Sequence, residues 1–114
     1  VRAALNERYF LGLRREEFHF ARYPVGKGYA KHLDQHRGQT ERRISLVLYL
    51  NPEWSATDGG QLRLFSSEDE MQEVTMITPQ WGRLVLFRSD LVPHEVLPCF
   101  QIRWSLTGWF RTDF

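Results

Sequence analysis

The sequence contains a single cysteine, Cys99, and no long uninterrupted run of apolar residues. One cysteine excludes a disulfide within the chain, which favours a reducing compartment such as the cytoplasm. A membrane-spanning helix needs about 20 consecutive, mostly apolar residues, and no segment of this chain reaches that length. From these absences we expect a cytoplasmic protein that does not insert into a membrane.

A strong excess of charge of either sign is also missing. Fifteen basic and fourteen acidic side chains give a formal net charge of +1. Such a balance offers no electrostatic reason to expect nucleic acid or an anionic membrane as the main partner. The chain has instead the composition of a packed protein, with 42% hydrophobic and 14% aromatic residues among 114. We expect residues 1–114 to form a single domain with one modest core.

Hydrophobic periodicity predicts a short helix over residues 1–10, followed by strands. Beyond the helix, apolar residues alternate or run together in short segments, separated by glycine, proline or charged residues. The predicted strands are residues 17–23, 29–34, 43–51, 61–65, 74–78, 83–87, 94–98 and 102–110. A mostly β chain with about eight short strands is typical of a double-sheet jelly roll.

The segment HLDQH, residues 32–36, places an aspartate between two histidines. On a helix, His32 and His36 would share one face as in zinc peptidases, but that motif needs a glutamate where Leu33 stands. On a strand, alternate side chains point the same way, so His32 and Asp34 would project together, about 6–7 Å apart at the backbone. This pair can occupy adjacent positions on one metal ion, and we expect His36 to lie in the loop that follows.

A third ligand would complete a 2-His-1-carboxylate triad, which leaves three positions on the metal for substrate and O₂. We favour His94, which follows a proline at the start of a predicted strand, over His19, which is better explained as a packed or surface residue. Arg103 lies on the next strand, and Tyr49 lies in a strand that is apolar on both faces. A buried arginine needs an anionic partner. A dicarboxylate cosubstrate would provide one.

Five segments occur in order between residues 17 and 110: ARYPVGKGYAKHLD, RRISLVLYLN, WSATDGGQLRLF, GRLVLFRSDLVPHEVLP and RWSLTGWF. As a set they resemble the iron(II)- and 2-oxoglutarate-dependent dioxygenases, specifically the prolyl 4-hydroxylase-like branch. The resemblance implies a jelly roll with an iron(II) centre that uses 2-oxoglutarate and O₂ as cosubstrates, with ascorbate in a supporting role. It also implies a protein or peptide substrate in which a prolyl residue is hydroxylated.

The resemblance also implies roles for nine residues of this chain. They would bind the iron (His32, Asp34 and His94), the 2-oxoglutarate (Arg103, Tyr49 and Thr107) and the substrate (Tyr23, Tyr29 and Trp109). Collagen-type enzymes have lysine in place of Arg103, so the chain resembles more closely the hypoxia-sensing enzymes and their bacterial homologues. Domains of this family carry supporting helices before the barrel, and we expect that most of these lie upstream of Val1.

Two other hypotheses stay open at this point. The same oxygenase chemistry would also suit another side chain, a free amino acid or a small molecule as the target. Alternatively, the chain is a cupin-like metal-binding module without turnover. The second alternative is disfavoured by Arg103 and Tyr49, because a simple metal-binding module has no need for a dicarboxylate clamp.

Overall fold

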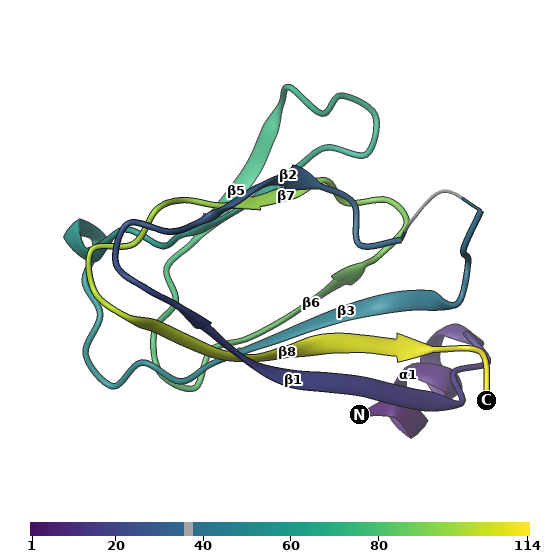
Figure 1. Cartoon of the computed structure of the whole chain (residues 1–114). Helices are drawn as coiled ribbons and strands as arrows, with labels where there is room; N and C mark the ends of the chain where they lie inside the picture. The colour runs from purple at the N-terminus through teal and green to yellow at the C-terminus, as the bar shows by residue number, and fades with distance from the viewer. Residues whose placement is uncertain (36–37) are drawn as a thin grey trace.

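The computed structural model describes residues 1–35 and 38–114. One α-helix, α1 (Arg2–Tyr9), precedes two facing sheets of four strands each, stacked as two layers in Figure 1. The first sheet has the order β1-β8-β3-β6, the second has the order β2-β7-β4-β5, and all neighbouring strands are antiparallel. The strands are β1 (Arg15–Tyr23), β2 (Tyr29–His32), β3 (Arg42–Tyr49), β4 (Leu62–Phe65), β5 (Glu73–Ile77), β6 (Leu84–Arg88), β7 (His94–Val96) and β8 (Arg103–Arg111).

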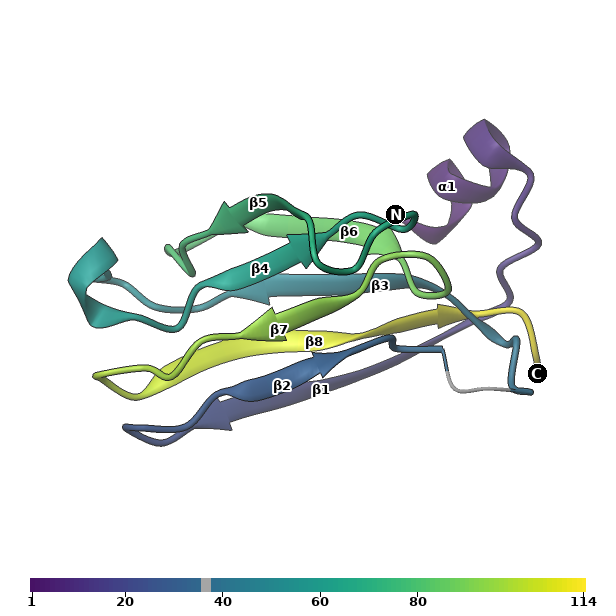
Figure 2. The same ribbon diagram turned by 90° about the horizontal axis from the view of Figure 1, so that it is seen from above.

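The two faces of the first sheet have different roles because side chains alternate along each strand. On the outer face, α1 packs at one end over a cluster formed by Leu13, Ile44, Leu46 and Phe110. Turned by 90°, the molecule shows α1 at this end of the sandwich (Figure 2). Further along this face apolar residues stay exposed, Phe20 to 73%. The inner face looks toward the second sheet, and a further buried cluster lies between the sheets: Tyr49, Leu62, Val85 and Phe87.

The predicted helix and the eight predicted strands are all present in the part of the chain that the structure describes, with small shifts at their ends. One shift matters for function. The strand predicted over residues 29–34 ends at His32, so Asp34 lies beyond the strand. The side chains of His32 and Asp34 do meet as expected, but strand alternation is not what brings them together. His32 pairs with His94, the first residue of β7, and this is the last pair in the ladder between β2 and β7.

Two other expectations concern a membrane-spanning helix and His36. No helix in the described residues is both long enough and apolar enough to cross a membrane. The expectation that His36 lies in a loop falls outside the described residues.

Candidate active site

The three candidate metal ligands meet where β2 ends and β7 begins. His32 and His94 are opposite one another in the antiparallel ladder, and the centroids of their rings are 4.3 Å apart. The Oδ1 atom of Asp34 lies 3.2 Å from the Nε2 atom of each ring. All three potential ligand atoms lie within 4.8 Å of one another, so a single metal ion can be bound between them.

Both histidines are oriented by a backbone carbonyl two residues earlier in the chain. Nδ1 of His32 is 2.7 Å from the oxygen of Ala30, and Nδ1 of His94 is 3.1 Å from the oxygen of Val92. Because a carbonyl oxygen only accepts hydrogen bonds, each neutral ring carries its proton on Nδ1. This tautomer leaves both Nε2 lone pairs free for a metal, the usual arrangement of metal-binding histidines.

The carboxylate of Asp34 is held in its ionised form. Burial by itself would raise its pKa, but the two imidazoles, which donate to the carboxylate through Nε2 when they are protonated, and the hydroxyl of Ser45 outweigh burial and hold the pKa of Asp34 well below its usual range. Burial likewise lowers the pKa of His32, and the hydrogen bond to Asp34 outweighs it, so the net shift of the His32 pKa is upward. A carboxylate that is ionised at neutral pH and flanked by two imidazoles is a donor set suited to a divalent transition metal.

Arg103 is a buried cation, only 3% exposed, on the inner face of β8. Its Nε donates a hydrogen bond to the oxygen of Gly60 (2.9 Å), and its Nη2 lies 3.4 Å from the hydroxyl of Tyr49. Burial raises the pKa of Tyr49 to about 12, although Arg103 opposes this, so the hydroxyl stays protonated. None of the described carboxylates forms an ion pair with Arg103. The arrangement therefore suits an anionic ligand.

Gly60 presents its own carbonyl oxygen to Arg103 through a backbone conformation that other residues rarely adopt. Its φ of +68° is in the left-handed region, and an added Cβ would lie 3.0 Å from both the Cδ of Arg103 and the ring of Trp54. In the sequence, Gly60 lies between two predicted strands, and no role in the site was predicted for it. The pair Gly59-Gly60 is a signal for an unusual turn, but it does not reveal which side chain the turn contacts.

All nine residues predicted for the site line one cavity of about 260 Å³ between the two sheets. The ring of Tyr29 lies 4.3 Å from that of His32, tilted by 49°, and Tyr29 is 53% exposed, which places it at the mouth. Tyr23 lies beside Arg103, whose guanidinium is 5.0 Å from the tyrosine ring, and burial raises the Tyr23 pKa. Thr107 and Trp109 follow on the same face of β8. The structure thus brings the nine residues together, while their individual roles stay predictions.

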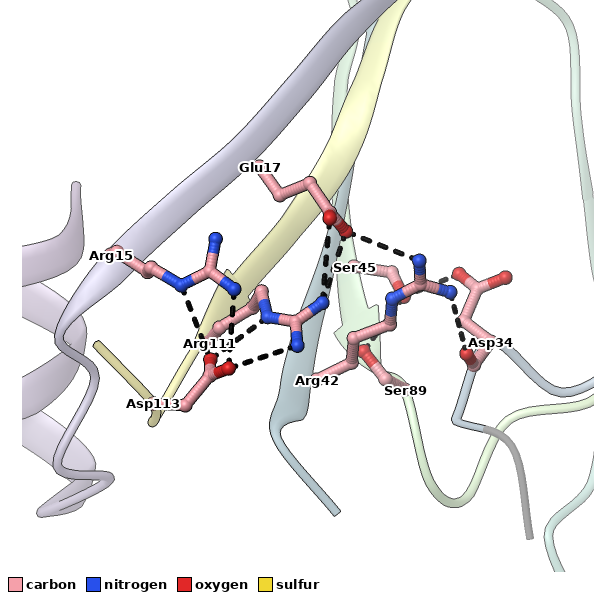
Figure 3. Close-up of polar contacts among 8 residues, drawn as sticks. All are labelled: Arg15, Glu17, Asp34, Arg42, Ser45, Ser89, Arg111 and Asp113. Atoms are coloured by element: carbon pink, nitrogen blue, oxygen red, sulfur yellow. Dashed lines mark hydrogen bonds and ion pairs between the residues drawn. The ribbon is translucent and has the colours of Figure 1, made fainter. Parts of the chain in front are cut away.

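Arg42 also lines this cavity and was missed by the sequence analysis. Its guanidinium stacks 3.6 Å from the centre of the Trp109 ring. As Figure 3 shows, Nη2 pairs with Glu17 at 3.1 Å, and Nη1 donates to the backbone oxygen of Asp34 at 3.3 Å. The ladder between β3 and β8 is irregular from Arg42 to Ile44. Such an irregularity changes the face to which a side chain points, and the sequence does not reveal it.

His19, for which the sequence left a packed or a surface position open, is a surface residue that also lines the cavity. Its ring lies 6.1 Å from that of Trp109 on the neighbouring strand. It does not belong to the group of three potential metal ligands. His19 therefore lies at the rim of the site, away from the candidate metal centre.

Comparison with known proteins gives the family. Residues 18–111 match the sequence pattern described as the 2OG-Fe(II) oxygenase superfamily. The match covers most of the chain, and the chain therefore belongs to this family. Its description specifies 2-oxoglutarate and ferrous iron, which agrees with the donor set and the buried arginine found here.

Individual relatives agree with this assignment. The chain is 40% identical over 92 residues to prolyl 3-hydroxylase OGFOD1 of Xenopus laevis, a match that covers 74% of this chain and 18% of that protein. The crystal structure of a Pseudomonas putida prolyl-4-hydroxylase superimposes with a TM-score of 0.91 at 51% identity, covering 98% of this chain and 61% of that one. A Trichoplax adhaerens prolyl hydroxylase in complex with a hypoxia inducible factor peptide fragment gives a TM-score of 0.76 at 34% identity, covering 88% and 46%.

These matches confirm the predicted family and the predicted jelly-roll fold. The chain nevertheless spans less than two thirds of the length of each of these three proteins. What their names say of activity and substrate bears on this chain only as support for a proposal.

Proposed function

We propose that this chain forms the catalytic core of an iron(II)- and 2-oxoglutarate-dependent dioxygenase that hydroxylates a prolyl residue in a protein or peptide. One observation carries the proposal: the three potential metal ligands lie within 4.8 Å of one another in the same cavity as a buried arginine that lacks an ion-pair partner among the described residues. A metal-binding module without turnover would leave this buried cation without a function.

The donor set fits the metal. Two histidines with free Nε2 atoms and one ionised carboxylate are the ligands that non-haem iron(II) oxygenases use, with the remaining positions open. His32, Asp34 and His94 would hold the ion. Iron and 2-oxoglutarate, when bound, supply the oxidising chemistry, and the protein supplies binding, orientation and exclusion of competing reactions.

The residues of the chain would orient the cosubstrate and keep water from it. The fork of Arg103 and the hydroxyl of Tyr49 would bind the carboxylate of 2-oxoglutarate that lies away from the metal, with Thr107 beside it. A planar guanidinium matches the geometry of a carboxylate. The walls between the polar groups are apolar and limit the access of water to the reaction: Val47, Leu62, Phe87 and Val96.

The substrate would enter at the aromatic mouth of the cavity. Tyr29 is exposed there, and the guanidinium of Arg42 lies over the ring of Trp109. An aromatic rim suits a prolyl ring, which is compact and apolar. The peptide complex of the Trichoplax adhaerens relative supports a protein or peptide as the target.

The names of the relatives differ in the carbon that is hydroxylated, because one is a prolyl 3-hydroxylase and another a prolyl-4-hydroxylase. We propose the 4-position. The 4-hydroxylase matches 98% of this chain at 51% identity, compared with 74% of the chain at 40% identity for the 3-hydroxylase.

The test is incubation of the protein with iron(II), 2-oxoglutarate, isotopically labelled O₂ and proline-containing proteins, followed by peptide mass spectrometry. The proposal predicts one labelled oxygen atom on proline, with succinate formed in step, and amino-acid analysis then separates 4- from 3-hydroxyproline. The His94→Ala variant is the control and should give neither product. A hydroxyl on a different residue type would refute the prolyl target, and labelled proline with the His94→Ala variant would refute the metal site.

A further inference from the structure

The two oxygen atoms of the Asp34 carboxylate have different partners. Oδ1 faces both histidines, 3.2 Å from each Nε2 atom. Oδ2 points away from them and accepts a hydrogen bond of 2.5 Å from the hydroxyl of Ser45. Because Asp34 lies beyond the end of β2, strand pairing does not fix this side chain, and its orientation depends on such contacts.

Ser45 is itself held rigidly. It lies in the middle of β3, between β8 and β6, and is only 1% exposed. Its hydroxyl is 2.9 Å from that of Ser89, which is fully buried. The backbone of Ser89 accepts a hydrogen bond from the N–H of Gln35 and donates one to the oxygen of Arg43, each at 3.0 Å. The backbone of Ser89 thus ties Gln35, the residue next to Asp34, to the start of β3.

The direction of these hydrogen bonds follows from the number of protons. A hydroxyl has one proton to donate, and an ionised carboxylate can only accept. Ser45 must therefore donate to Asp34, so the proton shared between the two serines comes from Ser89. A hydroxyl donating to a carboxylate at this distance is a charge-assisted hydrogen bond, which is stronger than a neutral one. The chain Ser89 to Ser45 to Asp34 has a single polarity, which favours one orientation of the carboxylate.

We propose that Ser45 is a positioning residue that makes Asp34 bind the metal through Oδ1 alone. The inference rests on the proposed function, since it assumes that a metal binds at this site. For both oxygens to bind, the carboxylate would have to turn Oδ2 away from Ser45 and toward the histidines, which would weaken the charge-assisted hydrogen bond. With one oxygen engaged, the protein supplies three ligand atoms, and three positions of an octahedral ion stay open for the cosubstrate and O₂.

The test uses metal-free protein and the metal ion alone. Mn²⁺ is titrated into the parent protein and into the Ser45→Ala variant, and the free ion is measured. We expect the variant to bind about 10- to 100-fold more weakly, the usual cost of losing a hydrogen-bond partner of a metal ligand. We also expect the visible spectrum of bound Co²⁺ to change, because the spectrum depends on the number and geometry of the ligands of the ion. A loss of packing elsewhere in the protein would leave these ligands, and therefore the spectrum, unaltered.

Two further variants make the result decisive. Ser105→Ala removes the same atom from a serine that is 2% exposed and lines the same cavity but has no hydrogen bond to Asp34 in the described residues, so its metal affinity should match that of the parent. Ser89→Ala keeps the Ser45 hydroxyl but removes its donor, and we expect a smaller loss of affinity. If Ser45→Ala does not fold, Ser89→Ala decides the question.

Each remaining outcome overturns one of the two proposals. Unchanged affinity and an unchanged Co²⁺ spectrum in Ser45→Ala, or equal losses in Ser45→Ala and Ser105→Ala, would refute the positioning role while leaving the metal site intact. Unchanged affinity in Ser89→Ala would refute the role if it is the only variant that folds. A parent protein that binds neither ion would refute the proposed function itself, and the inference would fail with it.

Discussion

Replacing Arg103 with lysine would keep a positive charge in the cavity but remove the planar fork. In the native site Nε is committed to the carbonyl of Gly60, which leaves the outer edge of the guanidinium to face Tyr49 and the cavity. A lysine ammonium is a point charge and cannot make both sets of contacts at once. Arg103→Lys should therefore weaken 2-oxoglutarate binding much more than it alters the chemical step.

The size of the effect follows from the contacts that are lost. A hydrogen bond to a charged group contributes about 1.5–3 kcal/mol, and about 1.4 kcal/mol corresponds to a tenfold change in affinity. Loss of one such bond raises the dissociation constant of 2-oxoglutarate by about 10- to 100-fold. Tyr49→Phe removes a hydroxyl that is 3.4 Å from Nη2, so it should cost less, about 0.5–1.5 kcal/mol.

The assay is anaerobic titration of the iron(II)-loaded protein with 2-oxoglutarate, followed by the visible absorption that the bound cosubstrate produces. Arg88→Lys is the matched control, because Arg88 is an exposed arginine that pairs with Asp90 and does not line the cavity. Unchanged dissociation constants in both Arg103→Lys and Tyr49→Phe would show that the cosubstrate carboxylate binds elsewhere. An equal loss in Arg88→Lys would show that the effect does not come from the cavity.

Four further predictions concern other parts of the site. His94→Ala should abolish the visible band of the anaerobic iron(II) and 2-oxoglutarate complex. The pKa of Asp34 is lower in the folded than in the unfolded protein. Its contribution to the stability of the metal-free protein is therefore present above the unfolded pKa of about 3.9 and is lost as the pH falls further. Asp34→Asn should remove this part of the pH dependence of the free energy of unfolding, measured with denaturant. Glu17→Gln should raise the KM for the protein substrate with little change in the KM for 2-oxoglutarate, because it frees Arg42 from its place on Trp109. Gly60→Ala should lower the free energy of unfolding by about 1–2 kcal/mol, because its backbone is left-handed.

Each of these four predictions would be contradicted by a specific result. A visible band that survives His94→Ala would remove that residue from the ligand set. An unaltered pH dependence in Asp34→Asn would mean that other groups control acid stability. A Glu17→Gln variant whose two KM values rise together would indicate a general loss of structure. Full stability of Gly60→Ala would mean that the turn adopts another backbone conformation.

The sequence predicted the parts of the site that depend on strand alternation. Arg103, Thr107 and Trp109 share one parity of β8 and do point into one cavity. Tyr49 is buried, as predicted for a strand that is apolar on both faces, and it lies on the inner face of β3. The pairing of His32 with His94 could be foreseen only in part, since alternation shows which face a residue occupies but not which strand lies opposite.

The parts that were missed depend on departures from regular strands. Asp34 reaches the site from a segment beyond β2, because the ladder between β2 and β7 stops at the pair of His32 and His94. Arg42 enters the cavity through an irregularity in β3. Ser45 has the parity of Tyr49, which was a usable signal, but a serine in an apolar strand is easily taken for a packing residue. Contacts between segments far apart in sequence determine all three positions.

The pairing of His32 with His94 also has a consequence for folding. The three ligands span more than half of the chain, from the end of one strand of the second sheet to the start of its neighbour, and the native register is what brings them together. A slip of one residue would turn one imidazole to the other face. A bound ion therefore favours the native register over any other, and at a concentration 100 times its dissociation constant it would add about 2.7 kcal/mol to the free energy of unfolding. The metal would thus hold β2 and β7 of the second sheet in register, and a lack of iron would lower the free energy of unfolding as well as stop the reaction.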